Sequence, residues 1–153
     1  FTKSQHQQII DPRLEYLQYE LENLSDVSII CHIETLFTVD NGYQMMKEFL
    51  KITPKNQYPE VFFASNDAIA VGAMRAILES GLSIPEDISL IGFNDVSVAK
   101  YVMPSLTTIK VHTDQMGRMA VDMINSLLDE PVDVPMKLEV GTTLVKRMSH
   151  KKI

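Results

Sequence analysis

The chain has 153 residues, of which 45% are hydrophobic and 22% are charged, a composition typical of one soluble globular domain. The formal net charge is −6, so this chain should not hold nucleic acid electrostatically, which takes clustered lysine and arginine. Cys31 is the only cysteine, which excludes an internal disulfide and agrees with a reducing compartment. No apolar run is long enough to span a bilayer, and no signal-peptide pattern is present.

The first predicted helix begins at Asp11 and Pro12, after a polar, glutamine-rich start. Aspartate is a good N-cap, and proline is tolerated at the first helical position. Arg13 would then lie in the first turn and face the space beyond the edge of a sheet. A lone arginine is more often a surface residue paired with a nearby acid, so the residue by itself leaves both interpretations open.

The next predicted elements are a strand over Val27–Ile33 and a helix over Asp40–Ile52, with Phe37 in the loop between them. Phe37 has two interpretations. It could anchor the loop on the core, or its ring could stack on the apolar face of a sugar. The residue by itself leaves both interpretations open.

The stretch from residue 61 to residue 95 predicts a strand, a helix and a second strand. Val61–Ala64 and Ile88–Phe93 are short apolar runs of the kind found in buried strands. Asn66 or Asp67 can cap the helix between them, and Gly81 stands where a helix commonly ends in the left-handed conformation. Two such strands joined by a helix form a βαβ unit, whose strands are parallel.

Polar side chains follow both of these strands. Asn66 and Asp67 come after the first, and Asn94 and Asp95 come after the second. Because parallel strands point the same way, these residues should emerge at one edge of the sheet, where open α/β folds bind ligands. Amide and carboxylate groups there suit a small polyhydroxylated molecule. The alternative is that these residues are only helix caps and turn formers.

The helix predicted over 67–80 is apolar around almost its whole circumference, apart from Arg75 and Glu79. Such a helix must be covered on a second side. The cover is either its own domain or another subunit, and we favour the subunit because so short a chain has few internal partners. A strand over Leu106–Val111, an amphipathic helix over Thr113–Leu128 and a strand over Lys137–Val145 follow.

The basic end, residues 150–152, should be a solvated and mobile tail. The chain has no glycine-rich phosphate loop and no GxSxG motif, and its four histidines lack the spacing of metal ligands. The sequence therefore contains no recognisable catalytic constellation, and we expect neither an enzyme nor a cofactor.

The string FASNDAIAVGAMRAILESGLSIPEDISLIGFND, followed by Tyr101 and PSLTTI, resembles the C-terminal half of the effector-binding domain in LacI/GalR-family bacterial transcription regulators. The resemblance runs from about residue 11 to residue 147. It implies an open, mostly parallel α/β sheet with helices on both faces, of the periplasmic-binding-protein type. It also implies a part of a longer cytoplasmic regulator, without the helix-turn-helix headpiece that would contact operator DNA.

In that family, residues 9–111 and 136–148 would form the C-terminal subdomain, and the helix at about 112–130 would belong to the N-terminal subdomain. The effector lies between the subdomains. The resemblance implies that a sugar effector, with galactosides as one candidate class, contacts four residues: Arg13, Phe37, Asn66 and Asn94. Asp67 and Asp95 would position them. Asn94 stands where the family often has aspartate, so hydroxyl binding should survive while the preferred effector could differ.

The resemblance also implies a homodimer, formed by the helix at 67–80 and the segment near residue 101. Its interface would include Val71, Met74, Tyr101 and Val102. Two other functions compete with this one. A sugar-binding receptor of a transport system has the same fold but normally works as a monomer, and an α/β enzyme would need the catalytic set that the sequence lacks.

Overall fold

The computed structural model of the protein describes residues 12–33, 35–130 and 133–151. Contacts divide the chain into two compact units, residues 1–34 and residues 35–153. The first unit contains helix α1 (Pro12–Glu22), which confirms the predicted helix, although its proposed cap Asp11 lies outside the described residues. The predicted strand over Val27–Ile33 is wrong, because these residues pair with no other strand. A strand forms only when its backbone groups find partners, and the described part of this unit has no second strand.

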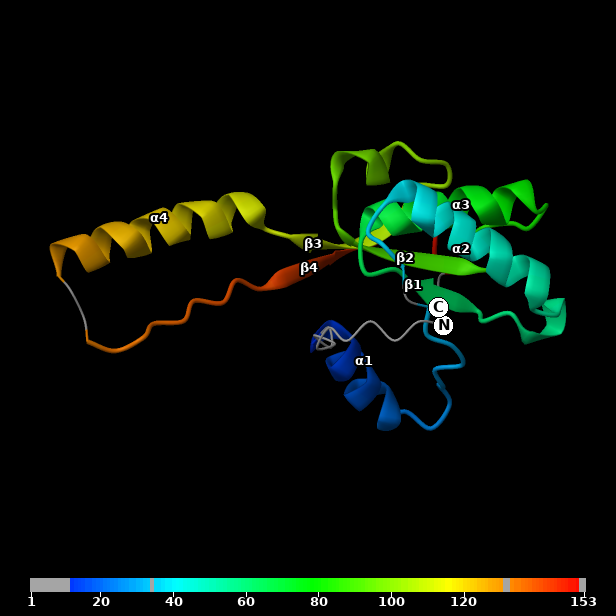
Figure 1. Cartoon of the computed structure of the whole chain (residues 1–153), viewed down its shortest axis with the longest axis horizontal. Coiled ribbons are helices and arrows are strands. Elements are labelled where there is room, and N and C mark those ends of the chain that lie inside the picture. The colour runs from blue at the N-terminus through cyan, green and yellow to red at the C-terminus, as the bar shows by residue number, and fades with distance from the viewer. Residues whose placement is uncertain (1–11, 34, 131–132, 152–153) are drawn as a thin grey trace. The chain divides into compact units, whose positions relative to one another are not determined.

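The second unit carries the sheet and the remaining helices (Figure 1). Its elements are α2 (Val39–Ile52), the 3-10 turn η1 (Lys55–Gln57), β1 (Val61–Phe63), α3 (Asp67–Glu79), β2 (Ser89–Asn94), the 3-10 turn η2 (Ser97–Lys100), β3 (Thr107–Val111), α4 (Thr113–Asp129) and β4 (Thr142–Val145). The helices and strands predicted between residues 40 and 128 are therefore confirmed to within two residues, whereas the strand predicted over Lys137–Val145 is confirmed only for Thr142–Val145.

The four strands lie in the order β1-β2-β3-β4. β1, β2 and β3 are parallel, and β4 is antiparallel to β3. The register pairs Phe63 with Ile91, and Ile91 with Thr107. This arrangement confirms the predicted open, mostly parallel sheet, and it brings the carboxyl ends of β1 and β2 to the same edge.

Helices α2 and α3 lie side by side (Figure 1), and two glycines bring their backbones almost into contact. A Cβ at Gly42 would lie 2.3 Å from the carbonyl oxygen of Ile69, and a Cβ at Gly72 would lie 2.0 Å from that of Val39. Only glycine allows so close an approach. The second side of α3 is therefore covered largely by α2, within the same chain.

Met74 shows the consequence most clearly, because only 2% of its surface is exposed. It belongs to the core that also holds Ile77, Ile88, Leu90 and Leu106. The prediction that Met74 contributes to a dimer interface is therefore wrong. The error came from treating α3 as a helix with few internal partners, when the glycines of α2 and α3 let the two helices interlock.

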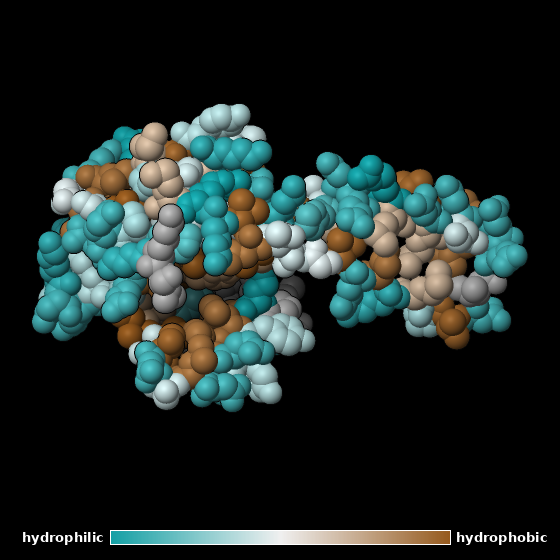
Figure 2. Space-filling view, turned by 180° about the vertical axis from the view of Figure 1, so that it is seen from behind, coloured by the Kyte–Doolittle hydropathy of each residue, from teal (hydrophilic) through white to brown (hydrophobic). Residues whose placement is uncertain are grey.

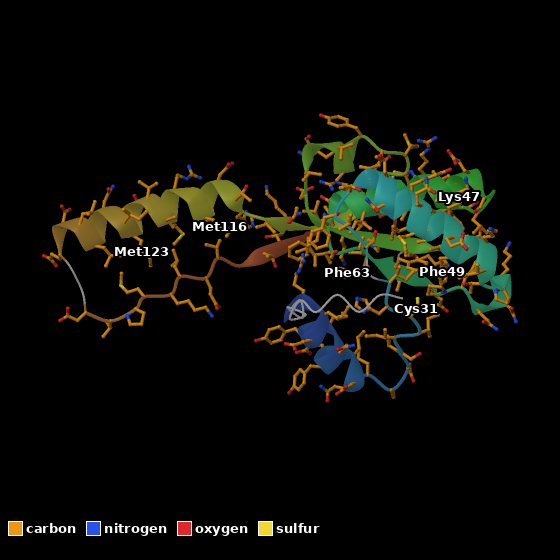
Figure 3. All side chains as sticks on the ribbon, viewed as in Figure 1. Cys31, Lys47, Phe49, Phe63, Met116 and Met123 are labelled. Carbon is orange, nitrogen blue, oxygen red and sulfur yellow. The ribbon has the colours of Figure 1, made fainter. Side chains whose placement is uncertain are left out.

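Helix α4 contains no buried residue, although its sequence is strongly amphipathic. Met116 and Met123 lie on the same side of it (Figure 3), and the exposed apolar residues of this part of the chain are Met116, Val121, Ile124, Leu128, Val134, Met136 and Leu138. Figure 2 shows brown apolar patches among hydrophilic side chains in the part of the chain that contains α4. An exposed apolar set of this size marks an interaction surface.

The C-terminal segment is held against the sheet, so the predicted mobile tail is wrong for His150 and Lys151. Ser149 is fully buried, and its Oγ donates to the carbonyl of Leu90 at 2.6 Å and accepts from the Thr107 N–H at 2.8 Å. His150 Nδ1 forms a 2.8 Å hydrogen bond with Thr107 Oγ1, and the Lys151 N–H donates to Ser89 Oγ. The basic residues of this segment did not indicate that it forms hydrogen bonds with the first residues of β2 and β3.

Candidate functional site

Asn66 and Asn94 lie at the same edge of the sheet. Phe63 pairs with Ile91, and each asparagine follows its member of this pair by three residues along parallel strands. Asn66 is half-buried and caps α3, because its Oδ1 accepts a hydrogen bond from the Ile69 N–H at 2.8 Å. The cap uses the oxygen, so the Nδ2 donors are the part of Asn66 suited to a ligand.

Asn94 ends β2 on an exposed turn with an unusual backbone. The φ angles of Asn94 and Asp95 are +109° and +58°. Residues with a Cβ seldom adopt positive φ, although Asn and Asp do so more often than most. Such conformations persist only where neighbouring groups hold them, and they are concentrated at ligand sites.

Asp67 is the buried centre of this edge, with none of its surface exposed. Its Oδ1 accepts from Thr108 Oγ1 at 2.5 Å, and its Oδ2 accepts from the Val96 N–H at 2.8 Å. One carboxylate therefore joins the start of α3, the start of β3 and the turn after β2. Gly92 leaves the necessary room, because a Cβ there would lie 2.3 Å from Asp67 Oδ1.

Asp95 forms an ion pair with Arg147, in which Nη2 lies 2.5 Å from Oδ1. Only 12% of the Arg147 side chain and 8% of the Asp95 side chain are exposed. Arg147 also donates through Nη1 to the carbonyl of Leu106 at 2.8 Å, and its backbone N–H donates to Thr107 Oγ1. Sequence reasoning did not select Arg147. Lys146 and Arg147 are adjacent, and the sequence does not show which of these two cations reaches Asp95.

Phe37 precedes α2, and 62% of its surface is exposed. An anchor packed on the core would be buried, so that interpretation is wrong for this side chain. Gly42 of α2 meets Ile69 in the first turn of α3, which places the amino ends of these two helices together. Phe37 and Asn66 thus precede neighbouring helix starts. Arg13 lies in the first turn of α1, in the other unit, and its role at the edge stays a prediction.

An open cavity of about 380 Å³ lies elsewhere in the second unit. It is lined by the start of α4 and by residues 139–143, and it includes none of the asparagines or aspartates described above. The candidate site is therefore not chosen by the size of this cavity. It is chosen because polar side chains converge at one edge of the sheet. Among the described residues, no group of three or more His, Cys, Asp and Glu side chains could hold a metal ion.

Comparison with known proteins identifies the family. The model of the periplasmic binding protein-like domain matches residues 1–150. The transcriptional regulator GalR of Streptococcus thermophilus is 39% identical over 145 residues, which are 94% of this chain and 43% of GalR. The lactose operon repressor of Rhizobium radiobacter is 36% identical over 113 residues, covering 74% of this chain and 96% of the repressor. The chain belongs to the LacI/GalR family.

Solved structures of the LacI family agree with this assignment. The Lac repressor bound to ONPG in its repressed state is 30% identical, with a TM-score of 0.80 over 90% of this chain and 40% of the repressor. A LacI-family regulator of Enterococcus faecalis with bound ribose is 34% identical, with a TM-score of 0.69 over 77% of this chain and 42% of that protein. The predicted family and fold are thus confirmed, and the chain spans less than half the length of GalR.

These LacI-family relatives are named as regulators of transcription and not as enzymes or transport receptors. Within the described residues, no helix is both long enough and apolar enough to cross a membrane.

Proposed function

We propose that this chain is the effector-sensing and dimerisation part of a bacterial LacI-family transcriptional regulator. A sugar binds at the edge formed by Asn66 and Asn94, and its binding changes the affinity of the whole protein for operator DNA. The observation that carries the proposal is the convergence of these two asparagines at the carboxyl ends of parallel strands. Two related structures support the ligand class, because the Lac repressor binds ONPG and the regulator of Enterococcus faecalis binds ribose.

The chemistry of the edge suits a sugar. Asparagine amides both donate and accept, so they can match hydroxyl groups in either role. The exposed ring of Phe37 supplies a flat apolar face for the C–H side of a pyranose or furanose. Asp67 and Asp95 do not need to touch the sugar, since each already holds a protein partner that fixes the turn.

The second half of the site comes from outside this unit. We place residues 9–111 and 136–148 in one subdomain and the helix at 112–130 in another, and the chain spans 43% of the length of GalR. The exposed apolar face of α4 supports this division, because a face of this kind requires a partner. Closing the two subdomains around a sugar is a conformational equilibrium that the sugar biases by its differential affinity.

The dimer surface is proposed at Val71, Tyr101 and Val102. Tyr101 is 82% exposed, and Val71 and Val102 are half-buried in the chain by itself. An isologous interface would bury all three against the same residues of a second copy. Coupling between sugar and operator then passes through the relative placement of the two subunits. The site of action is the cytoplasm, where operator DNA lies.

The test uses the full-length protein that contains this chain. Isothermal titration with galactose, methyl β-galactoside, lactose and ribose should show saturable binding of at least one sugar, and that sugar should change operator affinity in a gel-shift assay. A regulator with no affinity for any sugar of this panel, or turnover of the sugar in the calorimeter, would reject the proposal.

A further inference from the structure

The turn after β2 is the most constrained part of the candidate site. Asn94 and Asp95 both have positive φ, at +109° and +58°. Neither residue is glycine, so the conformation is maintained against the steric preference of two Cβ atoms. The neighbouring contacts must therefore hold the turn in this shape.

Two side chains from different parts of the chain form polar contacts with this turn. Asp67 of α3 accepts the Val96 N–H at 2.8 Å, and Arg147 binds the Asp95 carboxylate at 2.5 Å. Arg147 also donates to the carbonyl of Leu106, just before β3. Both Nη atoms of its guanidinium therefore have a hydrogen-bond partner. A planar guanidinium with two anchored N–H groups fixes direction as well as distance, which a lysine ammonium does not.

We propose that Arg147 is a positioning residue that sets the affinity of the site for its sugar. It holds the Asp95 side chain, and thereby keeps Asn94 and Asp95 in the left-handed conformation that presents the Asn94 amide. This inference rests on the proposed function, since the ligand of Asn94 is the sugar. Arg147 itself lies behind the turn, with most of its side chain buried, and does not contact the sugar.

The test separates the shape of the turn from the charge of the ion pair. Arg147→Met removes the ion pair with Asp95 and leaves the Asp95 carboxylate without a cation. Adding Asp95→Gly removes that charge and also lets the backbone adopt positive φ freely, whereas adding Asp95→Ala removes the charge but keeps a Cβ. The pair of double variants is therefore matched in charge and differs in backbone preference.

Isothermal titration of the full-length protein uses whichever of galactose, methyl β-galactoside, lactose and ribose binds the parent. Arg147→Met should weaken binding by about tenfold or more. Arg147→Met with Asp95→Gly should return to within about threefold of the parent, while the version with Asp95→Ala should stay weak. Parental affinity of Arg147→Met would overturn the inference, and so would equal rescue by alanine and glycine, which would make the unpaired charge the cause.

Hydrogen exchange in the 153-residue chain gives a readout that needs no sugar. The Val96 amide, which donates to Asp67, should exchange at least about tenfold faster in Arg147→Met and slow again with Asp95→Gly. The Ala64 amide, which donates to Ile91 within the sheet, is the internal control and should not change. If no sugar binds the parent, the proposed function fails while the Val96 result still decides whether Arg147 positions the turn. Unchanged exchange at Val96 contradicts the inference in either case.

Discussion

The absence of a Cβ at Gly92 makes room for the carboxylate of Asp67. A Cβ at position 92 would lie 2.3 Å from Asp67 Oδ1, and the carboxylate has no exposed surface into which it could move. The buried acid that joins α3, β3 and the turn after β2 thus depends on a glycine in the middle of a strand. The packing of Gly92 against Asp67 explains why glycine, which weakens strands, occupies a position inside the sheet.

Gly92→Ala should therefore destabilise the chain by about 1–3 kcal/mol, the usual cost of forcing extra volume into a packed interior. Urea denaturation measures the free energy of unfolding. The matched control is Gly117→Ala in α4, where a Cβ meets nothing within 4 Å and alanine should leave stability unchanged or raise it. Equal stability of the parent and Gly92→Ala would contradict the described position of Asp67.

Ser149 makes a second prediction. Its hydroxyl links β2 to β3 by donating to Leu90 and accepting from Thr107. Ser149→Ala leaves both buried backbone groups without their partner and should cost about 1–3 kcal/mol in the free energy of unfolding. Ser126→Ala, at an exposed serine of α4, is the control and should change stability by less than about 0.5 kcal/mol. A mobile C-terminal segment would make the two substitutions equivalent.

The surface contact between α2 and α3 predicts that the stability of the fold depends on pH. Tyr43 Oη donates to Glu79 Oε2 at 2.6 Å, and Arg75 Nε donates to Oε1 at 2.7 Å. The hydrogen bond from Tyr43, followed by that from Arg75, lowers the pKa of Glu79 from its usual value of 4.5. A carboxylate whose pKa is lower in the folded state stabilises the fold above the unfolded pKa, and this contribution disappears as pH falls through the folded pKa.

Tyr43→Phe should consequently lower stability at pH 7 and have a smaller effect at a pH well below 4.5, where Glu79 is protonated in both proteins. Thermal unfolding of both proteins at several pH values provides the comparison. The effect should be small, because the pair is exposed and solvent screens it. A larger loss of stability from Tyr43→Phe in acid than at neutral pH would contradict the stabilisation of ionised Glu79 by Tyr43.

The proposed dimer makes a prediction about assembly. Val102→Arg places a charge at the proposed symmetric interface and should shift sedimentation of the full-length protein toward monomer, because two like charges would face each other across the axis. Gln57→Arg, at an exposed residue of η1, is the control for added surface charge and should sediment like the parent. A parent protein that sediments only as monomer at micromolar concentration would remove the proposal.

Much of the architecture follows from sequence pattern, and the exceptions have identifiable causes. Apolar runs at Val61–Ala64 and Ile88–Phe93 predicted β1 and β2 because buried parallel strands are continuously apolar. The run at Val27–Ile33 has the same character yet forms no strand, since pairing depends on a neighbour that pattern alone does not supply. Local periodicity thus identifies a candidate strand but not its partner.

The candidate site was predictable where residues follow strands and unpredictable where distant segments meet. Asn66 and Asn94 could be placed at one edge from the parallel order of β1 and β2. Arg147 and Asp95 are far apart in sequence and meet only through the packing of the C-terminal segment, which no periodicity encodes. Likewise, the covering of α3 by α2 depends on Gly42 and Gly72, whose role appears only in three dimensions.

The central claim is that Asn66 and Asn94 together bind a sugar at the shared edge of β1 and β2. The most direct measurement is isothermal titration of the full-length protein, with Asn66→Ala and Asn94→Ala beside Asn56→Ala, an exposed asparagine of η1. Each edge substitution should weaken binding by about 1–3 kcal/mol, because buried hydroxyl groups of the sugar lose their partners, and Asn56→Ala should bind like the parent. Parental affinity in both edge variants would contradict the account.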